Sequence, residues 1–276
     1  MTLSLPDDAP RDVRVVATDF DRTLTWMDGL LHERTLAALA RAKAAGLHVI
    51  VVTGRMAQSV RRAIEPAGLH DPVICYQGAV VTDGEWRWLR HEPIPLELAR
   101  EAIEAVLAEG YPPNTYVDDE LYVESETDAA RNYAGFQGIQ FHVVGDLLGW
   151  ITKPPTKLVC VGDPAELEAV EVRMRERFAG RLHISKSLPF FLEFAQEGVT
   201  KGSGLDFLAA RMGFTREQTI AFGDGENDVE LLEWAGYGVA VENAHDRVKA
   251  VADWVCPSAE EEGVAQVLEA LLDSAA

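Results

Sequence analysis

Residues 14–25 read RVVATDFDRTLT, in which an apolar run leads directly into two aspartates, Asp19 and Asp21, separated by one phenylalanine. Continuous rather than alternating apolar residues are typical of a strand that is buried on both faces, as in a parallel sheet. The stretch therefore predicts a buried strand whose carboxyl end carries a pair of carboxylates.

Similar apolar runs recur along the chain and alternate with patterns of helical spacing. The runs cover residues 48–53, 72–77, 219–224 and 237–241, and the helical patterns cover residues 33–46, 200–213 and 226–236. Each helical pattern ends in glycine, which is a common helix terminator. The alternation predicts a doubly wound α/β domain with a mainly parallel sheet.

This alternation is interrupted after Val81, where the chain becomes polar and aromatic, and it resumes near residue 191. The intervening segment has its own helical patterns at 95–110 and 164–180, and extended runs at 114–125, 156–163 and 182–187. A segment of this length is large enough for a separate domain. We predict a core domain formed by residues 1–82 and 192–276, with residues 83–191 inserted as a smaller α+β domain.

The composition is that of an ordinary globular chain of 276 residues, but it is strongly acidic. A formal net charge of −20 disfavours a general surface for nucleic acid or anionic membrane, because both would be repelled. Three widely spaced cysteines fit reduced, buried thiols. No signal peptide or long apolar run is present, so we expect a cytoplasmic protein, either monomeric or homodimeric.

Polar residues follow several of the predicted strands at the point where each strand ends. Asp19 and Asp21 follow the first strand, Thr53 and Gly54 follow the second, and Asp224 follows a later one. In a doubly wound sheet the ligand lies beyond the carboxyl ends of the strands, so these residues should converge. A pair of carboxylates can hold a divalent cation, and an ionised aspartate can attack phosphorus.

Further residues of the same pattern suit an anionic ligand. The Thr53 hydroxyl and the Gly54 amide are suitable phosphate donors, and Lys201 adds a positive charge at the start of a predicted helix. Each motif alone is common in turns and helix entries. A calcium loop beginning at Asp224 is excluded, because its twelfth position is Ala235 rather than glutamate.

Taken in order, the segments DFDRT, TGR, VTKG and GDGENDVELLEWAG, followed by VENAHDRVKAVADWV, resemble the motifs of the haloacid dehalogenase superfamily. The similarity is to its Cof-type phosphatases with a type II cap, and it extends from about Val13 to the last helix. The segment YQGAVV at residues 76–81 also resembles that family's N-G-A segment, with Gln77 in place of asparagine.

The resemblance implies a role for each matching residue in a phosphatase that acts on a small phosphomonoester with Mg²⁺. Asp19 would be the nucleophile that forms an aspartyl-phosphate, and Asp21 the general acid and base. The metal ligands would come from Asp19, the main-chain carbonyl of Asp21 and Asp224, with Asp228 orienting Lys201 or a metal-bound water. Phosphate would be bound by Thr53, Gly54, Lys201 and Asn227.

The position of the insert indicates which branch of the superfamily the chain resembles. Only 31 residues separate Asp21 from Thr53, which leaves room for one loop and one helix but not for a cap domain. This spacing argues against the phosphomutase-like branch of the superfamily. By the same resemblance, the insert after the second motif would be a lid that excludes water and selects the leaving group.

One residue departs from the family pattern, since Arg22 stands where the family has glycine. We expect its guanidinium to point outward while its backbone N–H still serves the site. Two hypotheses remain open at this point. The chain is either a Mg²⁺-dependent phosphatase for a small metabolite such as a sugar phosphate, or a catalytically weak phospho-ligand binding protein of the same fold.

Overall fold

The computed structural model describes residues 3–274, which form two compact units. The core unit contains the chain through Gly54, then Val60–Leu89, and the chain from Thr200 onward. The inserted unit contains Arg55–Ser59 and Arg90–Val199. In the described part of the chain, no helix has both the length and the apolar composition needed to cross a membrane.

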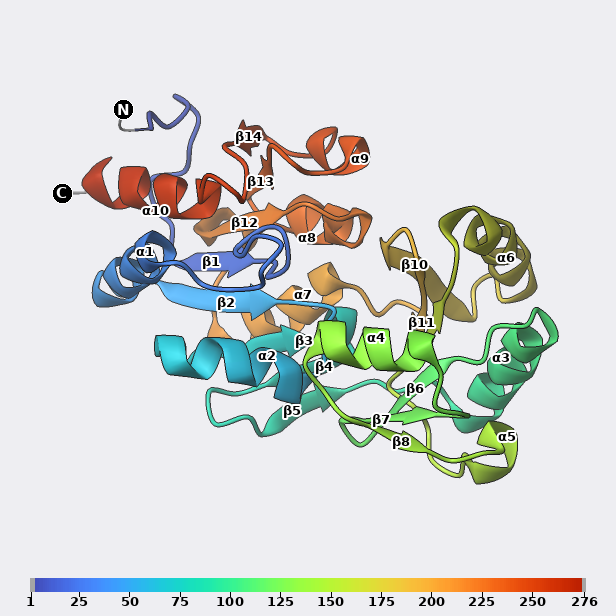
Figure 1. Ribbon diagram of the computed structural model, residues 1–276. Coiled ribbons are helices and arrows are strands. Elements are labelled where there is room, and N and C mark those ends of the chain that lie inside the picture. Colours follow the sequence, from blue (N-terminus) through green and yellow to red (C-terminus); the bar gives the residue numbers. More distant parts are fainter. Residues whose placement is uncertain (1–2, 275–276) are drawn as a thin grey trace. The chain divides into compact units, whose positions relative to one another are not determined.

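The core unit is built on an eight-stranded sheet in the order β14-β13-β12-β1-β2-β3-β4-β5 (Figure 1). The six strands from β14 to β3 are mutually parallel, and β4 is antiparallel to β3. The strands are β1 (Val15–Thr18), β2 (His48–Val52), β3 (Val73–Cys75), β4 (Val80–Thr82), β5 (Trp88–His91), β12 (Thr219–Gly223), β13 (Tyr237–Val241) and β14 (Trp254–Cys256).

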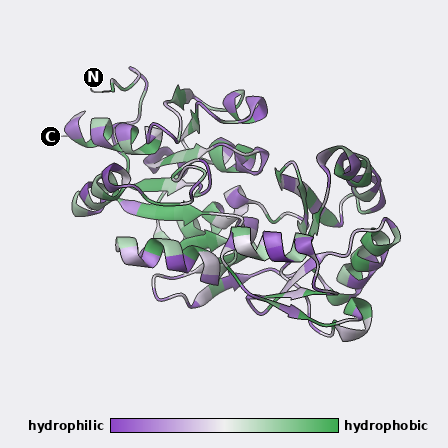
Figure 2. Ribbon diagram, in the orientation of Figure 1, coloured by the Kyte–Doolittle hydropathy of each residue, from purple (hydrophilic) through white to green (hydrophobic). Residues whose placement is uncertain are grey.

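The middle of this sheet is buried on both faces. Every residue of β1, β12 and β13 is buried, and Figure 2 shows the middle strands as largely hydrophobic. The helices that lie wholly or mainly in the core unit are α1 (Glu33–Ala44), α2 (Ala57–Ile64), α7 (Lys201–Met212), α8 (Val229–Trp234), α9 (Asp246–Lys249) and α10 (Gly263–Ser274). Because α1 buries Thr35, Ala38, Leu39 and Ala42, its apolar face follows the helical repeat.

The direction in which successive strands are added to the sheet reverses at β1. From β1 the chain passes through α1 to β2 on one side, whereas β12 on the other side leads through α8 to β13. Right-handed crossovers therefore place α1 and α8 on opposite faces of the sheet. The carboxyl ends of β1 and β12 flank this switch point, which is where doubly wound folds bind their ligands.

The inserted unit has a six-stranded sheet in the order β10-β11-β9-β6-β7-β8, in which only β7 and β8 pair in parallel. Its strands are β6 (Asn114–Val117), β7 (Glu120–Val123), β8 (Phe141–Val143), β9 (Lys157–Val161), β10 (Leu182–Leu188) and β11 (Phe191–Gln196). Its helices are α3 (Leu96–Ala108), α4 (Asp128–Gln137), α5 (Leu147–Trp150) and α6 (Pro164–Arg177).

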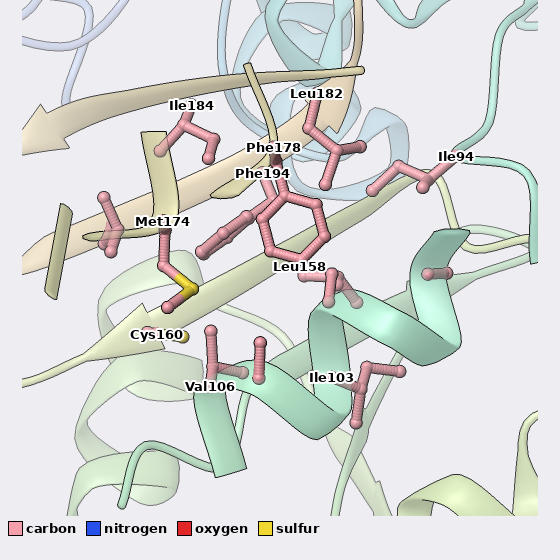
Figure 3. Close-up of a cluster of buried hydrophobic side chains, with 14 of the residues drawn as sticks. Ile94, Ile103, Val106, Leu158, Cys160, Met174, Phe178, Leu182, Ile184 and Phe194 are labelled. Carbon is pink, nitrogen blue, oxygen red and sulfur yellow. The ribbon is translucent and has the colours of Figure 1, made fainter. Parts of the chain in front are cut away.

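A separate hydrophobic core supports this unit. Side chains of α3 and α6, including Ile103 and Met174, pack with Leu158, Cys160 and Phe194 from the sheet (Figure 3).

The three cysteines of the chain are buried and free, as predicted.

The predicted fold class, a doubly wound core with an inserted α+β domain, is confirmed. The apolar run at 191–196, where we expected the core pattern to resume, instead forms β11 between β9 and β10 of the inserted sheet. An apolar run shows that a strand is buried, but it does not show which sheet supplies its neighbours.

Candidate active site

Asp19 lies at the carboxyl end of β1, and its buried side chain faces a buried lysine. Lys201 Nζ donates to Asp19 Oδ1 at 2.5 Å and to Asp228 Oδ1 at 2.5 Å. Burial raises the pKa of Asp19 well above its usual range, Lys201 opposes this shift, and the neighbouring carboxylates Asp228 and Asp224 increase it. The site therefore gathers more negative charge than its one buried cation neutralises.

The sequence around Lys201 explains how its side chain reaches this position. Thr200 is the N-cap of α7, and its side chain and that of Ser203 form a reciprocal capping box, which fixes the start of the helix. Lys201 is thus the first residue of α7 and is only 1% exposed. Burial would lower the pKa of Lys201, but the two carboxylates outweigh burial and raise it, so the ammonium stays charged.

Asp224 follows β12 and lies on the other side of the switch point. Thr23 Oγ1 donates to Asp224 Oδ1 at 3.1 Å, and Arg22 Nε lies 3.7 Å from Asp224 Oδ2. Burial and the nearby Asp228 raise the pKa of Asp224 to about 7, against the opposing effects of Arg22 and Lys201. A bound cation would relieve this electrostatic cost.

Asp228 organises the loop that carries Asp224. Its Oδ2 accepts hydrogen bonds from the backbone N–H groups of Asp224 and Gly225, at 3.0 and 2.9 Å. Its Oδ1 accepts from Lys201. Asp228 is completely buried, and both of its oxygens are engaged by donors. This arrangement supports a role in positioning the loop and the lysine.

The donor set fits a hard divalent cation. Asp19, Asp224 and Asp228 are buried, and each offers a carboxylate oxygen within 4.8 Å of those of the other two. Mg²⁺ and Ca²⁺ prefer such oxygen ligands. Asp21, the fourth predicted contributor, is half-buried two residues beyond Asp19 and forms an isolated bridge with Thr25.

Three of the predicted phosphate-binding residues follow β2 and β12, which lie on either side of β1 in the same sheet. Thr53 follows β2, is 1% exposed, and donates its backbone N–H to Ile74 at 2.8 Å. Gly54 comes next, where a side chain would meet Gln77, since a Cβ would lie 2.5 Å from Gln77 Nε2. Asn227, from the loop after β12, donates through Nδ2 to Gln77 Oε1 at 2.9 Å. The structure thus connects Gly54 and Asn227 through Gln77.

Two residues of this site received no role from the sequence. Thr23 belongs to the first motif, yet only the fold shows that its hydroxyl contacts Asp224. Gln77 stands in the segment that resembles N-G-A, and that resemblance was the only signal for it. No pattern in the sequence indicates that the Gln77 side chain reaches Asn227.

The expected orientation of Arg22 is wrong. Its backbone is left-handed, with φ 62°, which is the conformation that glycine adopts most easily. The guanidinium does not point away from the site, since Nε is buried beside Asp224. The opposite charges of Arg22 and Asp224 account for the inward turn.

Known proteins resemble this chain over most of its length. The family model of haloacid dehalogenase-like hydrolases matches residues 16–268. The chain is 30% identical over 278 residues to the pyridoxal phosphate phosphatase of Escherichia coli (strain K12), with 92% of this chain and 97% of that protein covered. It is 28% identical over 270 residues to the 5-amino-6-(5-phospho-D-ribitylamino)uracil phosphatase of Bacillus subtilis (strain 168), with coverage of 92% and 96%.

Solved structures give the same result. A haloacid dehalogenase-like hydrolase from Bacteroides thetaiotaomicron matches with a TM-score of 0.84 and 28% identity, covering 93% of this chain and 98% of that one. A haloacid dehalogenase-like hydrolase from B. subtilis matches with a TM-score of 0.84 and 26% identity, covering 93% and 99%. The predicted family and hydrolase class are confirmed: this chain belongs to the haloacid dehalogenase-like hydrolases.

Proposed function

We propose that this protein is a Mg²⁺-dependent phosphatase that hydrolyses small phosphomonoesters through an aspartyl-phosphate on Asp19. The observation that carries the proposal is the buried ammonium of Lys201 between Asp19 and Asp228, with Asp224 across the switch point. Such a site combines a nucleophilic carboxylate with positive charge for a phosphoryl group. Positioning and charge stabilisation account for most of the rate in phosphoryl transfer.

The first step forms a bond between an Asp19 carboxylate oxygen and phosphorus and breaks the bond to the leaving oxygen. Asp21 donates the proton that this alkoxide needs. In the second step Asp21 takes a proton from water, which attacks phosphorus and releases inorganic phosphate and free Asp19. Lys201, Thr53, Gly54 and Asn227 hold the phosphoryl oxygens in both steps.

Asp19, Asp224 and the backbone carbonyl of Asp21 would hold Mg²⁺, and Asp228 would orient their surroundings. When bound, the metal would supply positive charge that neutralises the phosphoryl oxygens and screens the carboxylates from one another. Burial is the main cause of the raised pKa values of Asp19 and Asp224, and the neighbouring carboxylates add to it. A bound cation would offset both effects, which supports this assignment.

We assign substrate selection to the inserted unit, whose main part is Arg90–Val199 rather than the predicted 83–191, and the chemistry to the core unit. Relatives named as phosphatases of pyridoxal phosphate and of a phosphoribitylamino uracil support a small phosphorylated metabolite as the substrate class. The leaving groups of those two substrates differ, which fits a common catalytic core with a variable selecting domain.

The test is hydrolysis of para-nitrophenyl phosphate by the full chain with and without Mg²⁺. We expect turnover that needs the metal and that falls by about 10³ or more in Asp19→Asn, because an amide is a poor nucleophile. Asp28→Asn is a matched control, since Asp28 is an exposed aspartate near the same motif whose side chain pairs with His32.

Wild-type rates in Asp19→Asn would remove Asp19 from the nucleophilic role. Full activity after exhaustive chelation would exclude the metal. Tight phosphate binding without any hydrolysis would instead favour the alternative of a catalytically weak phospho-ligand binding protein.

A further inference from the structure

The side chain of Gln77 lies between two segments that are more than twenty residues away from it in the sequence. Its Oε1 accepts a hydrogen bond from Asn227 Nδ2 at 2.9 Å. Its Nε2 occupies the space beside Gly54, where a Cβ would lie only 2.5 Å away. Gln77 is 3% exposed, so this contact is made in the interior of the core unit.

The backbone around Gln77 has an unusual conformation. Tyr76, Gln77 and Gly78 have φ of 52°, 60° and 108°, and they form a single 3-10 turn directly after β3. Two consecutive non-glycine residues in this region are costly, and such conformations persist only where surrounding contacts enforce them. Strained backbone of this kind is concentrated at functional sites.

Contacts on both sides hold this turn in place. The Gln77 N–H donates to the Thr53 carbonyl at 3.1 Å, which attaches the turn to the segment after β2. Gly78 lies against the Thr200 carbonyl so closely that a Cβ would approach it to 2.1 Å. The turn is therefore fixed against the residues that precede both Gly54 and Lys201.

We propose that Gln77 is a positioning residue that orients the carboxamide of Asn227 toward the phosphoryl group. A carboxamide has one accepting and one donating end, and the hydrogen bond to Gln77 Oε1 determines which end of Asn227 is presented. With one Nδ2 proton engaged by Gln77, the second remains for a phosphoryl oxygen. The Asn227 oxygen lies on the side of Gly225, where a Cβ would be 2.4 Å from Oδ1.

The neutral side chain of Gln77 suits this position. An acceptor is needed to engage the Asn227 amide, but a carboxylate there would add negative charge beside a phosphate dianion. Glutamine supplies the acceptor without that charge. The proposal rests on the proposed function, because it places Asn227 in contact with phosphate.

A double-mutant cycle on phosphate affinity tests it. Binding of inorganic phosphate to the Mg²⁺-loaded protein is measured by calorimetry for wild type, Gln77→Ala, Asn227→Ala and the double variant. We expect Gln77→Ala to weaken binding by about tenfold, the order of one well-placed hydrogen bond. In the Asn227→Ala background the same change should have almost no effect, because Gln77 acts through Asn227.

Gln77→Asn is the second variant, because asparagine tolerates φ above zero and keeps a carboxamide that is one carbon shorter. If Gln77→Ala does not fold, Gln77→Asn takes its place in the double-mutant cycle on phosphate affinity. Gln218→Ala is the matched control, since the Gln218 side chain accepts from the Thr215 N–H in a capping contact of its own and should leave phosphate binding unchanged.

The proposal would be overturned if the loss of phosphate affinity in the double variant equalled the product of the losses in the two single variants. Unchanged phosphate affinity in a folded Gln77 variant would also overturn it. A wild-type protein that does not bind phosphate would overturn it as well. If wild type binds phosphate but does not hydrolyse para-nitrophenyl phosphate, the proposed function fails while the cycle still decides the role of Gln77.

Discussion

Arg22 has a backbone conformation that costs free energy and a side chain that is attracted to Asp224. Its φ of 62° costs a non-glycine residue about 1 kcal/mol or more relative to glycine. Its side chain turns toward Asp224, and the Arg22 carbonyl accepts from Asn243 Nδ2 at 2.8 Å. The positive charge thus lies beside a predicted metal ligand, where it competes with any bound cation.

Replacing Arg22 by glycine should tighten Mg²⁺ binding. The Arg22 side chain is 37% exposed, so a dielectric close to that of water applies. Nε lies 3.7 Å from Asp224 Oδ2, and at about this separation the interaction between two charges is worth roughly 1 kcal/mol, or about fivefold in affinity. Titration calorimetry of Mg²⁺ measures the dissociation constant directly. Hydrolysis of para-nitrophenyl phosphate at saturating metal should change by less than about tenfold.

Arg22→Lys keeps the charge and should retain an affinity near that of wild type. Arg247→Ala is a control for general charge, because Arg247 is highly exposed and pairs with Glu226 rather than with Asp224. An unchanged or weaker Mg²⁺ affinity in Arg22→Gly would contradict the competition between arginine and metal.

At the scale of elements, Asp71 joins the turn between α1 and β2 to the segment that precedes β3. Its carboxylate accepts from Lys43 Nζ at 2.5 Å and from the Val49 N–H at 2.8 Å, and His48 Nδ1 lies 3.0 Å from its other oxygen. Burial alone would raise the pKa of Asp71, but these hydrogen bonds outweigh burial and lower it. Asp71 therefore stabilises the fold in its ionised form.

Asp71→Asn should lower the free energy of unfolding at pH 7 by roughly 1–3 kcal/mol, the range for hydrogen bonds to a buried charged group. Because the folded-state pKa is depressed, this stabilisation is present above the unfolded pKa of about 4 and is lost as pH falls through the folded value. The difference between wild type and variant should therefore shrink in acid.

Urea unfolding at pH 7 and at successively lower pH values measures this difference. Asp273→Asn is the matched control, because Asp273 forms an exposed ion pair with Arg41 that should contribute little at any pH. A difference that stays constant with pH would show that Asp71 does not act through its charge.

At the scale of the whole molecule, metal binding should be linked to stability. The chain has a net charge of −20, and three of its carboxylates are gathered at one site of the core unit. A ligand that binds only the folded state stabilises it by about 2.7 kcal/mol at one hundred times its dissociation constant. For a chain of this size, the midpoint of thermal unfolding should rise by roughly 5 °C.

This shift should be largely absent in Asp224→Asn, which removes one predicted ligand. Sodium chloride at equal ionic strength is the essential control, because any salt screens the repulsion within an acidic chain. Equal shifts with Mg²⁺ and with sodium chloride, in both proteins, would mean that screening rather than a specific site explains the effect.

Local pattern was sufficient to predict much of the fold. The runs that became β1, β2, β12 and β13 are continuous and apolar, because strands of a parallel sheet are buried on both faces, and α1 and α7 carry the helical repeat and end near glycine. The carboxylates at the ends of β1 and β12 could be expected to meet, since parallel strands present their carboxyl ends at one edge.

Other features depended on contacts between distant segments, which a local pattern does not encode. The strand at 191–196 could have joined either sheet, and only its pairing with β9 and β10 assigned it. The inward turn of Arg22 depends on Asp224, and the position of Gln77 depends on Asn227, about two hundred and one hundred and fifty residues away respectively. The sequence by itself determined which chemical groups stand at the strand ends, whereas the tertiary structure decided which of them contact one another. The reason is that the burial of a strand depends on the pattern of residues adjacent in the sequence, whereas the partner of a side chain is determined only when distant segments come together in the sheet.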